Sequence, residues 1–176
     1  MSVLKRLLAD RRPPPDAVRP LARDERVVAW ATAEGGGTVL ATPLGLWLPA
    51  PDGPERVPWH LVDKAIWRAG TLTVIAAEDT GGGVLAELPP RSVRLAEPRD
   101  LPPTVRARVE RSIGYSRHHG LAPSGGVRVV GRRVAGRDGL TWQLVFDAGT
   151  DRDDPLLRVQ ADDLVAAARV ETGGPR

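Results

Sequence analysis

Residues 25–61 read ERVVAWATAEGGGTVLATPLGLWLPAPDGPERVPWHL. Short apolar runs in this stretch are separated by turn residues, among them Gly35-Gly36-Gly37 and Asp52-Gly53. Apolar runs bounded by such residues are typical of antiparallel strands joined by hairpins. The stretch contains no nucleophile paired with a base, no cluster of metal ligands and no phosphate-binding loop. It therefore predicts an architecture and leaves the activity open.

The hairpin pattern continues to about residue 95 and then changes. The predicted strands cover about 25–33, 38–42, 45–49, 55–60, 64–68, 71–77, 84–88 and 92–95. From Leu101 onward the apolar residues recur every four positions, at Val105, Val109 and Ile113. This spacing predicts an amphipathic helix over 102–118, with Gly120 just beyond its end.

The C-terminal part predicts one more hairpin and one more helix. Strands at 127–134 and 140–147 flank a Gly-Arg-Asp-Gly turn, and Trp142 lies on the apolar face of the second strand, which we expect to be buried. Asp153 or Asp154 is expected to cap a final helix that begins at Pro155.

These elements divide the chain into three parts. Residues 1–20 form a short helix followed by a Pro-rich connector, 21–120 form a β domain with a capping helix, and 121–176 form a hairpin–helix extension packed on that domain. The predicted fold class is α+β.

The composition is that of a globular chain whose charge is unevenly distributed. Of the 176 residues 41% are apolar, none is cysteine, arginine outnumbers lysine 23 to 2, and the net charge is +3. Residues 101–137 carry eight arginines and one acid, whereas residues 138–172 carry eight acids and three arginines. The two segments either neutralise each other across the fold or mark a partner surface.

The N-terminus predicts no membrane anchor. Residues 2–8 could form a short basic amphipathic helix, and residues 2–12 could make at most weak contact with a membrane. They lack the apolar region of a signal peptide, and no apolar run approaches the ~20 residues that span a bilayer. Since the chain also has no cysteine, we expect a cytoplasmic location.

Four segments carry a resemblance to a known superfold: ERVVAW at 25–30, VLATPLGLW at 39–47, VPW at 57–59 and LTV at 72–74. Residues 25–118 resemble the pleckstrin-homology (PH) superfold in its bacterial or GRAM-like form, and the whole chain resembles a set of uncharacterised actinobacterial proteins. The resemblance implies an antiparallel PH-like β-barrel or sandwich closed by a helix, and binding of lipids, peptides or proteins. The loop that binds phosphoinositides in some members is here Glu34-Gly35-Gly36-Gly37, which has no basic residue.

The candidate partner surface is rich in arginine. Arg106 and Arg117 are eleven residues apart, so they would share one face of the predicted helix. Guanidinium groups bind phosphates and carboxylates through paired hydrogen bonds. The candidate residues are Arg106, Arg108, Arg111, Arg117, His118, Arg128, Arg132 and Arg133.

Other motifs favour structural roles. Adjacent histidines on a helix, His118 and His119, would point about 100° apart and could not both bind one metal ion. Ser116 is not in a G-x-S-x-G elbow, and no glycine cluster has the Lys-Ser/Thr ending of a phosphate-binding loop. We therefore predict no catalytic, metal or cofactor site.

The sequence favours a non-enzymatic cytoplasmic interaction module whose partner is a protein. One alternative is a nucleic-acid or ribosome-associated protein that uses the Arg-rich surface at 106–133. A second alternative is an enzyme that uses Ser116 or His118. The identity of the partner and the oligomeric state are left open.

Overall fold

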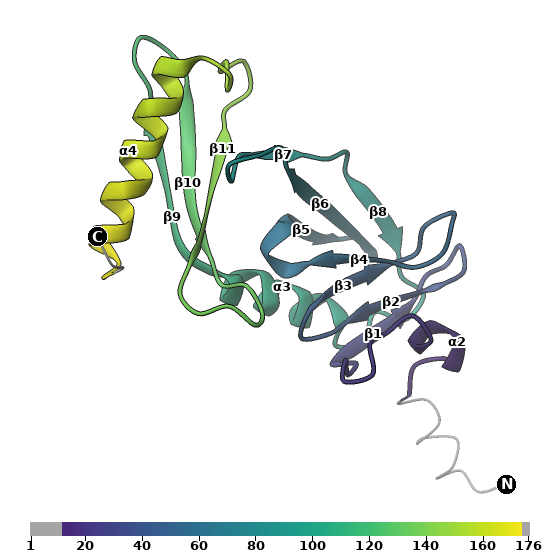
Figure 1. Cartoon of the computed structure of the whole chain (residues 1–176). Coiled ribbons are helices and arrows are strands. Elements are labelled where there is room, and N and C mark those ends of the chain that lie inside the picture. Colours follow the sequence, from purple (N-terminus) through teal and green to yellow (C-terminus); the bar gives the residue numbers. More distant parts are fainter. Residues whose placement is uncertain (1–11, 174–176) are drawn as a thin grey trace, which may run out of the picture.

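A computed structural model of the protein describes residues 12–173. Its described part is α+β, with antiparallel sheets arranged around two hydrophobic cores (Figure 1). The elements in chain order are α2 (Pro15–Val18), β1 (Ala29–Thr32), β2 (Thr38–Ala41), β3 (Gly45–Leu48), β4 (Glu55–Pro58), the 3₁₀ turn η1 (Trp59–Leu61), β5 (Val62–Arg68), β6 (Thr71–Asp79), β7 (Leu85–Glu87), β8 (Arg91–Arg94), α3 (Leu101–Ser112), β9 (Ile113–Gly120), β10 (Gly126–Arg132), β11 (Thr141–Phe146) and α4 (Pro155–Glu171).

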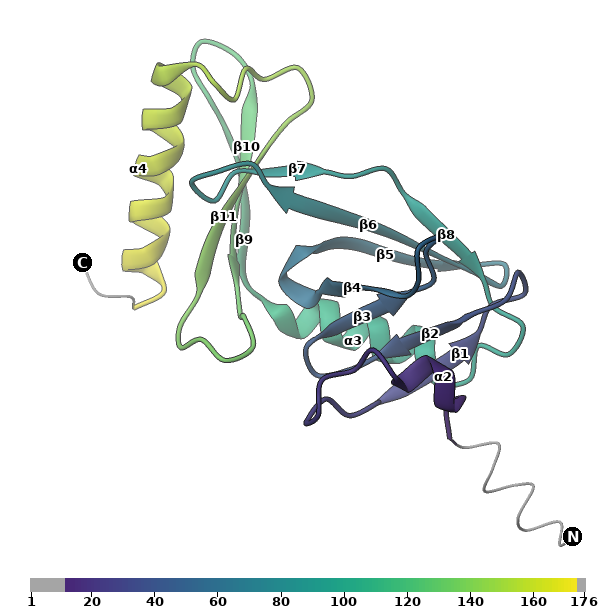
Figure 2. The ribbon, with the colours of Figure 1, turned by 45° about the vertical axis from the view of Figure 1, so that its right-hand side comes forward.

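The first core lies between two sheets and one helix. One sheet has the order β1-β2-β3-β4, and in the other β6 pairs with β5 along one edge and with β8 and β7 along the opposite edge. Both sheets and α3 contribute buried apolar side chains, for example Leu46, Val74 and Val105. Helix α3 covers the end of this sandwich, where it contacts β1, β2, η1 and β5 (Figure 2).

Among the described residues, backbone pairing joins the two sheets at one corner. An antiparallel bridge connects Ala33 to Leu95, and the Ala96 N–H donates to the Thr32 carbonyl at 2.9 Å. No β-pairing among residues 12–173 links β4 to β5, so the sandwich does not close into a barrel. The predicted α+β class with antiparallel sheets is confirmed, and the closed-barrel form of the prediction is wrong.

The second core belongs to a three-stranded sheet of order β11-β10-β9, covered on one face by α4 (Figure 1). The Asp154 side chain accepts a hydrogen bond from the Leu156 N–H at 2.8 Å, and Pro155 begins the helix, as the sequence predicted. Leu157, Ala161 and Ala168 of α4 are buried in this second core.

Trp142 is only half-buried in this second core. Its ring meets the Tyr115 ring edge-on, with 5.4 Å between centroids, and both rings pack against the second core. The neighbouring Gln143 is buried, and its amide donates to the His60 carbonyl at 3.0 Å. Trp142 is therefore less buried than the sequence predicted.

The prediction of a helix over 102–118 is wrong in its second part. Helix α3 ends at Ser112, and residues 113–120 form strand β9. The helical spacing of apolar residues does extend to Ile113, but the following residues pair with β10 from Gly120↔Gly126 to Ile113↔Arg132. Long-range pairing outweighs the local periodicity, and Gly120 ends a strand rather than a helix. The sheet of the second core therefore begins before residue 121.

At the N-terminus the Pro-rich connector contains a short helix, α2, which the sequence did not predict. The helix expected within residues 2–8 lies outside the described residues.

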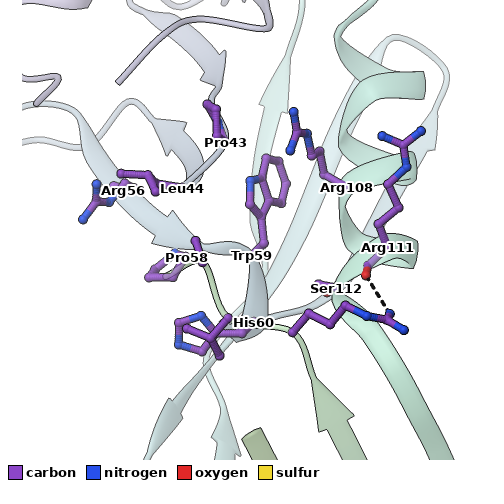
Figure 3. A pocket seen from close by; sticks show the side chains of 12 residues that line it. Pro43, Leu44, Arg56, Pro58, Trp59, His60, Arg108, Arg111 and Ser112 are labelled. Carbon is purple, nitrogen blue, oxygen red and sulfur yellow. Dashed lines mark hydrogen bonds between the residues drawn. The ribbon is translucent and has the colours of Figure 1, made fainter. Parts of the chain in front are cut away.

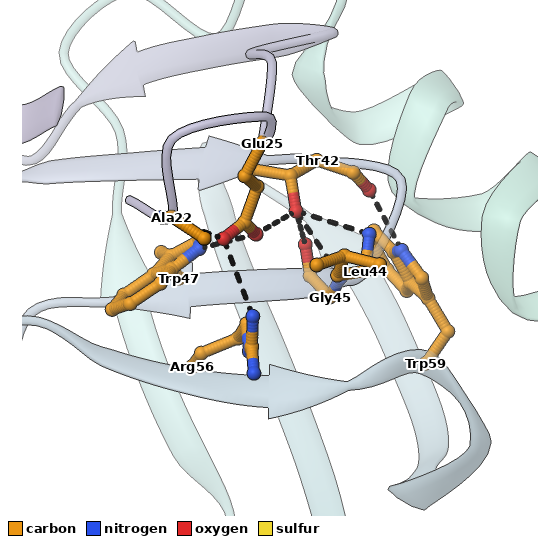
Figure 4. A network of polar contacts seen from close by, with 8 residues as sticks. All are labelled: Ala22, Glu25, Thr42, Leu44, Gly45, Trp47, Arg56 and Trp59. Carbon is orange, nitrogen blue, oxygen red and sulfur yellow. Dashed lines mark hydrogen bonds and ion pairs between the residues drawn. The ribbon is translucent and has the colours of Figure 1, made fainter. Parts of the chain in front are cut away.

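A buried carboxylate ties the segment that follows α2 to the first sheet (Figure 4). Glu25 accepts hydrogen bonds from the Thr42 hydroxyl, from Trp47 Nε1 at 3.0 Å and from Arg56 at 3.2 Å. The Ala22 N–H is a fourth, longer donor at 3.4 Å. Since Glu25 is 9% exposed, these partners replace the water that a carboxylate would otherwise need.

The two cores are joined by polar contacts as well as by packing. Arg132, which is 2% exposed, donates to the Ser112 hydroxyl at 2.7 Å and to the Val62 carbonyl at 3.0 Å. Arg128 pairs with Asp63 at 2.6 Å, and the Leu144 N–H donates to the Gly83 carbonyl at 2.8 Å. Arg132 and Arg128 thus attach β10 to the beginning of β5.

Candidate functional site

The sheets of β1–β8 together with α3 form the first unit, and the sheet of β9–β11 together with α4 forms the second unit. A groove runs between strand β5 and helix α3 of the first unit. Its volume is about 780 Å³, within the usual range for ligand sites. Apolar side chains make most of its wall: Ala65, Ile66, Trp67, Leu72, Pro98, Pro102, Pro103, Val105 and Val109. The groove therefore suits an apolar or amphipathic occupant.

Strand β5 presents an open edge to this groove. It pairs with β6 alone among the described strands. The hairpin to β6 turns through Ala69 and Gly70, whose φ angles of 48° and 80° fit a two-residue type I′ turn. Hydrogen-bonded and non-bonded pairs alternate from the closing pair Arg68↔Thr71, so the backbone groups of Ala65 and Trp67 point away from β6.

Two large apolar side chains are exposed on this edge strand. Ile66 is 48% exposed and Trp67 is 40% exposed. Natural proteins generally protect edge strands with charges, prolines or covering segments, because an open apolar edge invites pairing with another chain. In this protein Ala65 packs on the first core, and Trp67 lies on the same face of the strand.

The charged groups around the groove are neutralised in pairs. Arg106 donates to Glu110 at 2.7 Å, Lys64 pairs with Glu87 at 3.1 Å, and Asp63 pairs with Arg128 at 2.6 Å. Arg99 pairs with Glu97 at 2.9 Å and lies over the Trp30 ring. The rim thus offers little net charge to attract a polyanion.

The protonation of the β5 groups agrees with this pairing. Burial alone would raise the pKa of Asp63, but the hydrogen bond from Arg128 and the charges of Arg128 and Lys64 lower it below its ordinary value. The hydrogen bond to Glu87 raises the pKa of Lys64. Both side chains are therefore charged at neutral pH.

The eight predicted surface residues do not form one surface. Arg106 lies on the rim of the groove, whereas Arg108 and Arg111 line a separate cleft together with Arg133. Arg132 is buried, and Arg128 is held by Asp63. The set is divided because α3 ends at Ser112 and the remaining members lie on or beyond strands.

Arg117 and His118 lie on β9, so the expectation that Arg106 and Arg117 share a helix face is wrong. Arg117 forms two hydrogen bonds with Glu171, at 2.9 and 3.1 Å, and His118 pairs with Asp147 at 2.8 Å. These contacts join the basic segment to the acidic C-terminal segment, which neutralises part of the charge asymmetry.

The residues considered for catalysis have other surroundings. No hydrogen bond within the described part of the chain joins a serine hydroxyl to His118, whose Nε2 contacts Asp147. Ser116 is exposed on β9, and Ser112 bonds to the Val109 carbonyl and Arg132. Residues 12–173 also hold no group of three acidic or histidine side chains placed to bind a metal ion.

The groove residues Ile66 and Trp67 were missed by sequence reasoning. A signal was present, because two adjacent large apolar residues point to opposite faces of a strand. Only one of them can face a core that covers a single side of the sheet.

Comparisons with known protein families, with curated proteins and with solved structures found no match to this chain. No helix within residues 12–173 is long and apolar enough to cross a membrane.

Proposed function

We propose that the chain is a non-enzymatic interaction module that binds an extended segment of a partner protein along the open edge of β5. The observation that carries this proposal is the unpaired β5 backbone next to an apolar groove, with Ile66 and Trp67 exposed beside it. An extended segment would add a strand to the sheet, so backbone hydrogen bonds would give affinity. Its alternate side chains would enter the groove and give specificity.

The dimensions and charges support a peptide segment as the occupant. Strand β5 has seven residues, which at about 3.3 Å each span roughly 20 Å. A nucleic acid would need unpaired cations, whereas Lys64, Arg99 and Arg106 each pair with a carboxylate. A partner segment with apolar residues at alternate positions fits this arrangement.

The test begins with peptides of about eight residues, selected from a random display library against the purified protein. Affinity of a selected peptide is then measured by calorimetry for the wild type, for Trp67→Ala and for Leu156→Ala. Leu156 is the matched control, because it is 71% exposed on α4, away from the groove. We expect Trp67→Ala to weaken binding about tenfold or more and Leu156→Ala to leave it unchanged.

Two outcomes would contradict the proposal. Equal affinity of the Trp67→Ala variant would place the peptide elsewhere. A wild-type dimer that dissociates in the Trp67→Ala variant, seen by light scattering, would assign the β5 edge to a second copy of the chain.

We also propose that the first unit is a PH-like domain and that the protein is cytoplasmic. Two antiparallel sheets joined at one corner, with a helix across one end, support the first of these. The absence of cysteine fits the second. An experimental structure and cell fractionation test them.

A further inference from the structure

A second cleft lies between the two units, on the side of α3 where the helix ends (Figure 3). Its volume is about 490 Å³, which suits a small molecule. The walls come from the β2–β3 turn, the end of β4 with η1, the last turn of α3, and the chain after β10. Four of the lining residues are basic: Arg56, Arg108, Arg111 and Arg133.

The lining contains four arginines and no carboxylate. Arg56 is partly neutralised, since it pairs with Glu25 at 3.2 Å and lies over the Trp47 ring. Arg133 donates to the backbone carbonyls of Arg111 and Ile113, which leaves its positive charge in place.

Arg108 and Arg111 have no ion pair and no side-chain hydrogen bond within residues 12–173. They are three residues apart on α3, which places them on neighbouring positions of one helix face. Arg108 is half-buried and Arg111 is exposed at the cleft. The C-terminus of α3 carries only about half a negative charge, so it does not neutralise three guanidinium groups.

The contrast with the rest of the molecule is informative. Arg106, Arg117 and Arg128 all pair with acids, although Arg106 lies on the same helix. A concave site that concentrates unpaired cations raises the local concentration of anions.

His60 adds a polar atom rather than a charge to this cleft. Burial, and then the positive charges of Arg132 and Arg137, lower its pKa, so the imidazole is neutral at pH 7. The charge of the cleft thus comes from arginine, which does not titrate in the physiological range. Leu44, Pro58 and Val134 supply apolar wall beside it.

We propose that this cleft binds the phosphate groups of a small soluble molecule, held by Arg108, Arg111 and Arg133, with the body of that molecule against Leu44, Pro58 and Val134. Guanidinium groups form paired, charge-assisted hydrogen bonds with phosphate oxygens. The apolar wall favours an ester such as a nucleoside diphosphate over a bare inorganic ion.

The experiment measures binding of pyrophosphate, ADP and adenosine by calorimetry at physiological salt. We expect ADP and pyrophosphate to bind at one site and adenosine to bind far more weakly. The Arg108→Gln/Arg111→Gln double variant should lose at least about a hundredfold in affinity, since each of the two lost charge-assisted bonds is worth about ten- to a hundredfold. The control is Arg106→Gln, on the same helix but outside the cleft, which should bind like the wild type.

A thermal melt shows whether the double variant folds, and the exposed single variant Arg111→Gln gives a weaker loss if the double variant does not. Absence of binding at millimolar pyrophosphate and ADP would overturn the proposal, as would an equal loss in Arg106→Gln.

Two further outcomes would overturn the proposal by showing that the cleft binds a membrane surface or a nucleic acid instead of a small molecule. One is retention of phosphatidic acid vesicles without ADP binding. The other is binding of a single-stranded oligonucleotide alone, with a salt dependence of several phosphates. Trp67→Ala should not change ADP binding, so this test is independent of the peptide groove.

Discussion

The buried carboxylate of Glu25 makes the stability of the fold depend on pH. Burial alone would raise its pKa, but hydrogen bonds from Thr42, Trp47 and Ala22 and the charge of Arg56 lower it below the ordinary value of 4.5. The folded state therefore binds a proton at Glu25 less readily than the unfolded state. The resulting stability is present above pH 4.5 and is lost as the pH falls through the lowered pKa.

We predict that Glu25→Gln lowers the free energy of unfolding at pH 7 by about 1–3 kcal/mol, because buried donors lose a charged acceptor. The difference between the wild type and the variant should shrink as the pH falls below 4.5. Urea unfolding of both proteins at several pH values measures this difference. A difference that stays constant down to pH 3 would mean that the Glu25 carboxylate is not stabilised as described.

For single residues, the sequence shows which side chains are charged, but it does not show what surrounds them in the fold. The eight candidate residues were grouped by charge, yet Arg132 is buried, Arg128 and Arg117 are paired, and only Arg108, Arg111 and Arg133 share a cleft. Burial of an arginine depends on carbonyls far away in the sequence, such as that of Val62. No local pattern reports such a partner.

Among the elements, the contact between β3 and β4 depends on one glycine. A Cβ added to Gly45 would lie 2.5 Å from the Val57 carbonyl oxygen, which belongs to the backbone of the paired strand. We predict that Gly45→Ala separates the two strands and lowers the free energy of unfolding by about 1–3 kcal/mol.

The control is Gly35→Ala in the β1–β2 turn, where an added Cβ meets nothing within 4 Å. That change should alter the stability by less than about 1 kcal/mol. Denaturant unfolding of both variants compares them. If Gly45→Ala is as stable as Gly35→Ala, then β3 and β4 are not held as closely as the structure indicates.

The hairpins were predictable because their turn chemistry is local. Gly35–Gly37, Asp52-Gly53 and the turn before Leu140 each lie between strands, and Asp154 caps α4 as expected. The boundary between α3 and β9 was not predictable, because Ile113 continues the helical spacing while its backbone pairs with Arg132. The half-burial of Trp142 likewise depends on how α4 lies across the sheet.

Over the whole molecule, the two cores are connected around one end of β5. Arg132 and Arg128 of β10 bond to Val62 and Asp63 at the beginning of β5. Helix α3 also contacts β5. The connection fixes the beginning of β5 and leaves the edge of its later residues open. The adjacent pair Ile66 and Trp67 was a signal in the sequence, but the groove and the arginine cleft themselves were not predictable, because both depend on the order of strands and on how the two units meet.

The addition of a strand to β5 can be tested through the backbone of the bound peptide. A selected peptide is synthesised with one amide N-methylated at a time, and each affinity for the protein is measured by calorimetry. Strand addition predicts alternation: methylation should abolish binding at every second residue, where the amide faces β5, and be tolerated between them. If N-methylation is tolerated equally at all positions and only side-chain changes affect affinity, the segment does not pair with β5, and strand addition is contradicted.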